Sequence, residues 1–155
     1  PFLAKHCDVF YIGGTKVGAM MGEAVVFSSM KAPKYFFTNV KRHGALLAKG
    51  RMLGIQFDTL FTDELYFKIS RHAINMATRI RSIFQKHGIA IAYDSPTNQQ
   101  FVVLSPSLYE ALSKKVAFEI WERKSDTEII CRFVTSWATK DKELDELDDI
   151  LQAQS

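Results

Sequence analysis

A glycine-rich loop that carries one lysine between two apolar segments constrains this chain more than any other stretch. Residues 9–12 (Val-Phe-Tyr-Ile) and 24–27 (Ala-Val-Val-Phe) combine β-branched and aromatic side chains, which predicts two short buried strands. Between them, residues 13–18 read Gly-Gly-Thr-Lys-Val-Gly, and glycines permit backbone conformations that other residues avoid. The pattern therefore predicts that Lys16 lies on a tight loop at the end of a strand.

Two interpretations of Lys16 follow from this pattern. An amine in an apolar setting loses solvation, which favours its neutral form and frees the lone pair to attack a carbonyl carbon and form a Schiff base. This is the chemistry that a pyridoxal phosphate (PLP) enzyme requires of its lysine. Glycine-flanked lysines are also common in ordinary hairpin turns, where the amine is simply solvated. The residues of the loop leave both interpretations open.

Four segments in order resemble the low-specificity threonine aldolases, which belong to the β-eliminating lyase branch of the fold-type-I PLP-dependent enzymes. The segments are residues 8–27, which contain Gly-Gly-Thr-Lys, and residues 47–57, 94–101 and 132–139. In that family the lysine of the Gly-Thr-Lys motif carries the cofactor, which the resemblance assigns to Lys16, with Thr15 beside it. The resemblance therefore favours the Schiff-base interpretation of this lysine.

Arg132 is a second candidate, and it interrupts the apolar run Ile-Ile-Cys-Arg-Phe-Val. A guanidinium in such a strand is costly without a partner, so we expect an anionic group beside it. A structural ion pair and a bound substrate would both satisfy this requirement. The resemblance favours substrate, because the family's arginine in Arg-Phe-Val-Thr binds the substrate carboxylate, for which a planar fork is well suited.

The basic stretch of residues 41–51 is either a solvated basic face or part of a subunit interface. The resemblance implies that Lys49 or Arg51 reaches toward the cofactor phosphate of a neighbouring subunit in a homodimer or homotetramer. The family places an arginine in register with Ala48, where this chain has none.

The resemblance implies an α/β fold in two parts. Residues 1–57 correspond to the end of a PLP-binding large domain, and residues 58–155 to a small α+β C-terminal domain with a mostly antiparallel sheet. In the family, a large domain ahead of the lysine supplies the phosphate loop, an aromatic ring over the cofactor and an Asp under its nitrogen. We therefore expect this chain to be the C-terminal part of an enzyme, truncated or separate from an N-terminal half, and inactive in isolation. The base that takes the substrate's hydroxyl proton is expected in that missing half.

Periodicity and end signals predict the remaining elements. The first is a long helical stretch from about residue 35 to residue 60. Thr62 is predicted to cap a second helix, which His87 and Gly88 end. Further along, we expect strands at 89–93, 99–104, 117–123 and 127–137, and helices at 106–115 and 140–151.

Composition excludes several classes of protein. A net charge of +3 and the absence of an arginine-rich run argue against nucleic acid, and no apolar stretch of membrane length is present. Cys7 and Cys131 are predicted to be reduced core residues on strands of a cytoplasmic protein. His72 and His87 are expected on the surface, because no second His or Cys lies at metal spacing. The acidic run within residues 140–151 is expected to be a solvated face.

The activity implied by the resemblance is retro-aldol cleavage of threonine, or of a related β-hydroxy-α-amino acid, to glycine and an aldehyde. Another PLP-dependent reaction, β-elimination or transamination, would use the same lysine and arginine. A third possibility is a non-catalytic fragment or dimerisation domain that binds no PLP.

Overall fold

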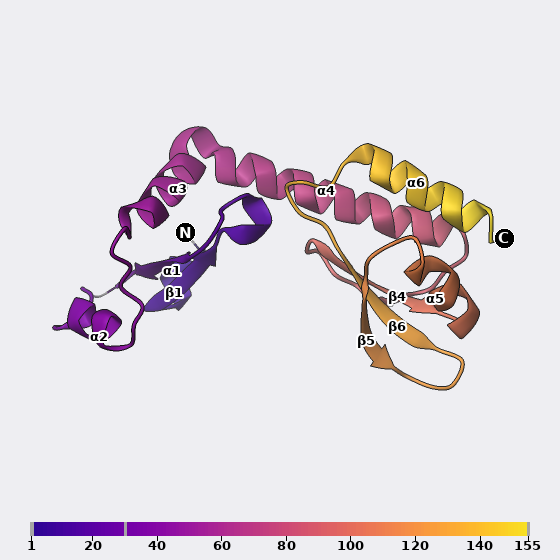
Figure 1. Cartoon of the computed structure of the whole chain (residues 1–155), viewed down its shortest axis with the longest axis horizontal. Helices are drawn as coiled ribbons and strands as arrows, with labels where there is room; N and C mark the ends of the chain where they lie inside the picture. Colours follow the sequence, from indigo (N-terminus) through magenta and orange to yellow (C-terminus); the bar gives the residue numbers. More distant parts are fainter. Residues whose placement is uncertain (1, 30, 155) are drawn as a thin grey trace. The chain divides into compact units, whose positions relative to one another are not determined.

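The computed structural model describes residues 2–29 and 31–154, which fall into two compact units. The units are Pro1–Tyr66 and Phe67–Ser155, so the boundary lies near the start of a long helix, α4 (Leu65–Lys86). Figure 1 shows the elements of each unit in chain order. Each unit is described below by itself.

The first unit contains a two-stranded antiparallel sheet and short helices. Its elements are α1 (Phe2–His6), β1 (Val9–Gly13), η1 (Thr15–Val17), β2 (Glu23–Phe27), α2 (Phe36–Arg42), α3 (Arg51–Phe61) and η2 (Thr62–Glu64). The two predicted strands are thus confirmed, with Val9 opposite Phe27 and Gly13 opposite Glu23. They are not buried as predicted, because one face of the hairpin exposes large side chains, among them Tyr11.

The single long helical stretch predicted over residues 35–60 is wrong. The structure has α2, an irregular segment over residues 43–50, and then α3. Gly44 has a φ of +71°, a left-handed conformation that glycine adopts without strain, and the Ala45 amide donates to the Val40 carbonyl (2.9 Å). This arrangement is a common helix ending, and it separates the two helices.

Thr62 does not begin α4 in the predicted way. Its backbone is extended and it ends α3, and its hydroxyl donates to the Asp58 carbonyl one turn earlier (2.8 Å). The next two residues, Asp63 and Glu64, both have positive φ angles. A short 3-10 turn, rather than a Thr62 cap, therefore connects α3 to α4.

The second unit is a four-stranded antiparallel sheet covered on one face by helices. In addition to α4 it contains β3 (Ile91–Tyr93), β4 (Gln99–Leu104), α5 (Pro106–Ser113), β5 (Glu119–Arg123), β6 (Ile129–Val134) and α6 (Asp141–Gln152). The strand order is β3-β4-β6-β5. The predicted elements are all present within a few residues, and Ser105 caps α5 by accepting from the Leu108 amide.

One continuous core joins the helices of the second unit to the sheet. Apolar residues of α4 and leucines of α6 both pack against alternate residues of β4 and β6. The core members are Met76, Ile80, Ile83, Phe84, Val102, Leu104, Leu112, Ile129, Cys131, Phe133, Leu144, Leu147 and Leu151. By alternation, the opposite face of the sheet carries Gln99, Phe101 and Arg132 together with aliphatic residues.

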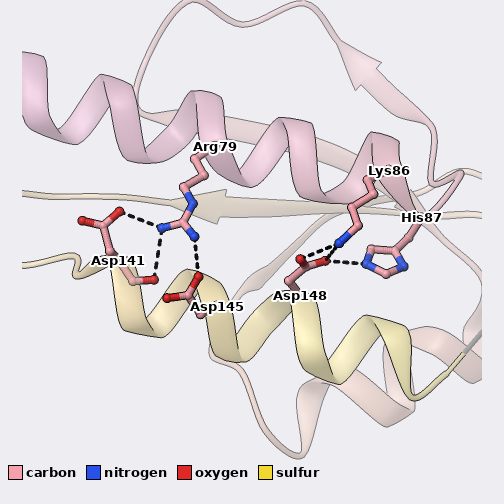
Figure 2. Close-up of polar contacts among 6 residues, drawn as sticks. All are labelled: Arg79, Lys86, His87, Asp141, Asp145 and Asp148. Carbon is pink, nitrogen blue, oxygen red and sulfur yellow. Dashed lines mark hydrogen bonds and ion pairs between the residues drawn. The ribbon is translucent and has the colours of Figure 1, made fainter.

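Ion pairs connect α4 to α6, as Figure 2 shows. Arg79 pairs with Asp141 (2.7 Å) and Asp145 (2.5 Å). The Asp148 carboxylate accepts a hydrogen bond from Lys86 (2.7 Å), and its Oδ1 lies 2.6 Å from Nε2 of His87. The hydrogen bond from Lys86 is the largest cause that lowers the pKa of Asp148, and the hydrogen bond from His87 is the second. The acidic run is mostly a solvated face, as predicted, since the side chains of Asp141 and Asp145 are 71% and 62% exposed. Several of its carboxylates also pair with α4.

The two histidines near α4 are not free surface groups. The side chain of His87 is only 6% exposed and contacts Asp148, whereas His72 Nε2 lies 2.8 Å from the Thr139 carbonyl oxygen. Within residues 2–29 and 31–154, no cluster of three or more His, Cys, Asp or Glu residues is placed to hold a metal ion. Over the same ranges, no helix is both long enough and apolar enough to cross a membrane.

The cysteines differ from each other. Cys131 is fully buried in β6, as predicted, and Cys7 is half-buried. Cys7 follows α1 and lies outside the strands, so its predicted place in a strand is wrong. Both thiols are free.

Candidate active site

Lys16 lies at the centre of the loop between β1 and β2, as predicted. The loop forms the short 3-10 turn η1, whose Val17 is buried and anchors it, while Lys16 and Thr15 are exposed. The Val17 and Ala19 amides both donate to the Gly14 carbonyl (3.1 and 2.9 Å). The loop therefore has a defined backbone that presents the lysine outward.

Helix α3 packs directly against this loop. A Cβ atom on Gly14 would lie 2.6 Å from the Cβ of Ala19 and 3.1 Å from the ring of Phe57, so only glycine fits there. Gln56, also on α3, accepts from the Met20 amide (2.6 Å). These helix residues lie in the segment 47–57, one of the four on which the family resemblance depends.

A second support comes from Tyr66, whose hydroxyl donates to the Gly13 carbonyl at the end of β1 (3.0 Å). Burial raises the pKa of this hydroxyl, which keeps it protonated and able to donate at neutral pH. The sequence analysis did not identify Gln56, Phe57 or Tyr66 as supports of the lysine loop. The glycine pair was the available signal, since it implies a close neighbour without saying which residue that is.

The apolar setting predicted for Lys16 is not supplied by the described residues of its unit, because the lysine is exposed. Lys49 and Arg51 are exposed as well, the latter as the first residue of α3. The structure thus places all four proposed cofactor-binding residues of the first unit at its surface, three of them cationic. Their roles toward a cofactor stay a prediction.

Arg132 lies in the second unit on β6, between Phe101 of β4 and Glu119 of β5. Its neighbours along the strand, Cys131 and Phe133, point into the core, so by alternation Arg132 faces the other side of the sheet. One terminal nitrogen, Nη1, donates to Oε1 of Gln99 (3.1 Å). The other, Nη2, donates to the carboxylate of Glu119. The expected anionic partner is therefore present within the chain.

An aromatic ring, that of Trp121, lies over the same guanidinium. The Trp121 ring centroid is 5.4 Å from Cζ of Arg132, a cation–π distance. Trp121 in turn meets Phe101 edge-on, and Phe101 meets Tyr93 in the same way. The sequence analysis missed Gln99, Glu119 and Trp121, because their proximity depends on which strands are adjacent in the sheet.

The two candidate groups lie in different units. Lys16, Thr15, Lys49 and Arg51 belong to the first unit and Arg132 to the second. The residues of the first unit include a primary amine on a loop of defined backbone. Arg132 of the second unit has a guanidinium with one nitrogen that lacks a hydrogen-bond partner among the described residues. A primary amine can form a Schiff base with a carbonyl group, and a guanidinium can bind a carboxylate.

Comparison with known proteins gives consistent matches. The chain is 29% identical over 142 residues to the low specificity L-threonine aldolase of Pseudomonas sp. strain NCIMB 10558, covering 90% of the chain and 40% of that protein. It is 28% identical over 106 residues to the protein of the same name from Pseudomonas aeruginosa, covering 68% of the chain and 31% of that protein. No family model matches the chain.

Solved structures extend these matches. A threonine aldolase of Leishmania major superposes with a TM-score of 0.93 at 35% identity, over 98% of this chain and 44% of the other. An 8-amino-7-oxononanoate synthase of Francisella tularensis has a TM-score of 0.57 at 12% identity, over 85% of this chain and 41% of the other, a likeness of fold alone.

The mixed α/β fold is that of part of a fold-type-I PLP-dependent enzyme, as predicted. Within that class the chain matches threonine aldolases, and it spans about two fifths of the length of these relatives.

Proposed function

We propose that this chain forms the lysine-bearing and arginine-bearing part of a PLP-dependent lyase. The reaction is cleavage of the bond between Cα and Cβ of threonine, or of a related β-hydroxy-α-amino acid, to glycine and an aldehyde. The observation that supports it best is the Lys16 loop, held by α3, in a chain 35% identical to the Leishmania threonine aldolase over 98% of its residues.

Lys16 is the residue that attaches the cofactor. Its amine is exposed at the tip of a loop whose backbone is fixed by Gly14 and Gln56, so the nitrogen can meet a carbonyl carbon without reorganising the loop. Thr15 beside it, and Lys49 or Arg51 at the start of α3, supply a donor and positive charge suited to a phosphate group. When bound, PLP supplies an electron sink for the pair released as the carbon–carbon bond breaks.

Arg132 orients the substrate. A guanidinium that binds the α-carboxylate at two points would fix where that carboxylate lies. With the amino nitrogen held by the cofactor, this would set rotation about the bond between the nitrogen and Cα, so that the scissile bond could stand perpendicular to the ring, the orientation in which cleavage is assisted. The rigid central strand β6, Gln99 and Trp121 hold the guanidinium for this purpose.

The remaining parts of the proposal concern the whole enzyme. We propose that the chain acts in the cytoplasm, in a homodimer or homotetramer, together with a further large domain that supplies the rest of the cofactor site. The base for the β-hydroxyl proton belongs to that domain. Division of the chain after residue 57 stays a prediction.

The test of Lys16 is reduction of the PLP-loaded, intact gene product with borohydride, followed by intact mass and peptide mapping. We expect one reduced pyridoxyl phosphate group on the peptide that contains Lys16. Lys16→Ala should abolish the adduct and lower the rate of cleavage by about a thousandfold or more, because the attacking amine is lost. Lys114→Ala, at an exposed lysine that follows α5, is the matched control and should keep both.

Product analysis separates the possible reactions. Glycine and acetaldehyde from L-threonine identify the aldolase, whereas pyruvate from L-serine would identify a β-eliminating lyase. If the protein carries the adduct on Lys16 yet releases no glycine from any β-hydroxy amino acid, the aldolase proposal is wrong. If it binds no PLP at all, the chain belongs to a non-catalytic protein.

A further inference from the structure

Only two of the three nitrogens of the Arg132 guanidinium have hydrogen-bond partners among the described residues. Nη1 donates to Gln99 and Nη2 donates to Glu119, but Nε is buried without a hydrogen-bond partner among the described residues. A buried polar hydrogen without an acceptor is uncommon in folded proteins, since it loses its bond to water without replacement. The arginine therefore retains one donor for an acceptor that the chain itself does not provide.

The unused donor is next to Nη2, the nitrogen that binds Glu119. In a planar guanidinium, the Nε hydrogen and one Nη2 hydrogen are parallel, and together they match the two oxygens of a carboxylate. A second carboxylate bound to this pair would share Nη2 with Glu119, and the two negative charges would repel each other. This repulsion favours displacement of Glu119 from Nη2 by a carboxylate that binds both donors.

Glu119 is placed so that it can leave. Its side chain is 67% exposed, and it lies on the edge strand β5, every residue of which is exposed. Arg132 has only 27% of its side chain exposed, and Gln99 and the Trp121 ring hold it independently of Glu119. Release of the glutamate into water therefore leaves the arginine in position.

We propose that Glu119 is an internal competitor for the substrate carboxylate. It pairs with Nη2 of Arg132 while the site is empty, and the α-carboxylate of the incoming amino acid displaces it and binds Nη2 and Nε together. This inference rests on the carboxylate-binding role proposed for Arg132. Because the competing state lowers the fraction of sites ready to bind, Glu119 raises the KM for the amino acid and excludes weaker carboxylate ligands.

The first test measures binding without catalysis. The side-chain Nε–H signal of Arg132 is followed by ¹⁵N NMR in the 155-residue chain during titration with sodium acetate, with sodium chloride as the ionic-strength control. We expect the signal to shift with acetate only, and Glu119→Gln to lower the apparent Kd by about three- to fivefold, because an exposed ion pair is weak. The matched variant Glu122→Gln, on the same strand but bonded to Tyr93, should leave the Kd unchanged.

The second test uses the PLP-loaded, intact gene product. Glu119→Gln should lower the KM for L-threonine by about the same factor with kcat unchanged, whereas Arg132→Lys should raise it about tenfold or more. An unchanged or higher acetate Kd or KM in Glu119→Gln would overturn the proposal, since the glutamate would then be neutral or would position Arg132. Failure of the proposed function looks different: no glycine is released, while the acetate titration still reports on Glu119.

Discussion

At the scale of single residues, the two cysteines are expected to differ in reactivity. Cys131 is fully buried, and burial raises the pKa of its thiol to about 11, so only about one thiol in a thousand is ionised at pH 8. Iodoacetamide at pH 8 should therefore modify the half-buried Cys7 in the folded protein and Cys131 only after denaturation. Intact mass before and after addition of guanidinium chloride measures this. The Cys7→Ser variant should stay unlabelled until it is denatured, and labelling of that variant when folded would contradict the prediction.

The residue scale also shows what the sequence could and could not predict. The Lys16 loop follows from its glycines, and the need of Arg132 for an anion follows from its apolar neighbours. The identity of that anion does not follow, because Glu119 is brought to Arg132 by the pairing of β5 with β6. Lys16 was expected in an apolar setting, but the strands on either side of it proved to be exposed within the chain.

At the scale of elements, the contact between α4 and α6 is expected to depend on pH. In the folded state Lys86 and His87 lower the pKa of Asp148 below its ordinary value of 3.8, so the ionised carboxylate stabilises the fold at pH values above 3.8. This stabilisation is lost as the pH falls from 3.8 to the lower pKa of the folded state. Asp148→Asn should therefore be less stable than the wild type at pH 7, and the difference should shrink toward pH 3. Urea denaturation followed by circular dichroism at both pH values measures it.

The control for this prediction is Asp149→Asn, which removes an exposed carboxylate from the next position of α6. It should change stability little at either pH. A loss of stability in Asp148→Asn that is the same at pH 3 as at pH 7 would show that the carboxylate charge is not responsible.

Helix boundaries show the limit of sequence patterns at this scale. The long helix α4 was predicted to end at His87 and Gly88, and it ends at Lys86, because its apolar residues repeat with helical period and pack on the sheet. The stretch before it was predicted as one helix, yet it divides at Gly44. The positive φ of Gly44, which ends α2, is not visible in the spacing of apolar residues.

At the scale of the whole molecule, the two units should differ in local stability. All thirteen residues of the continuous core lie in the second unit, whereas the sheet of the first unit has two strands with exposed faces. Two-stranded sheets are marginal in water without further packing. Hydrogen exchange measured on the 155-residue chain should therefore be slower for amides of β4 and β6 than for those of β1 and β2. Equal protection of the two sheets would contradict this expectation.

The hairpin of the first unit also bears on how copies of this chain behave in solution. A two-stranded sheet has two outer edges with backbone donors and acceptors that point away from the pair. Val9, Tyr11 and Val25 add exposed apolar surface beside those edges. Such edges accept any extended segment, including the same hairpin of another copy, which is the first step of fibrillar aggregation. At high concentration, the solubility of the 155-residue chain is therefore governed by what covers this hairpin.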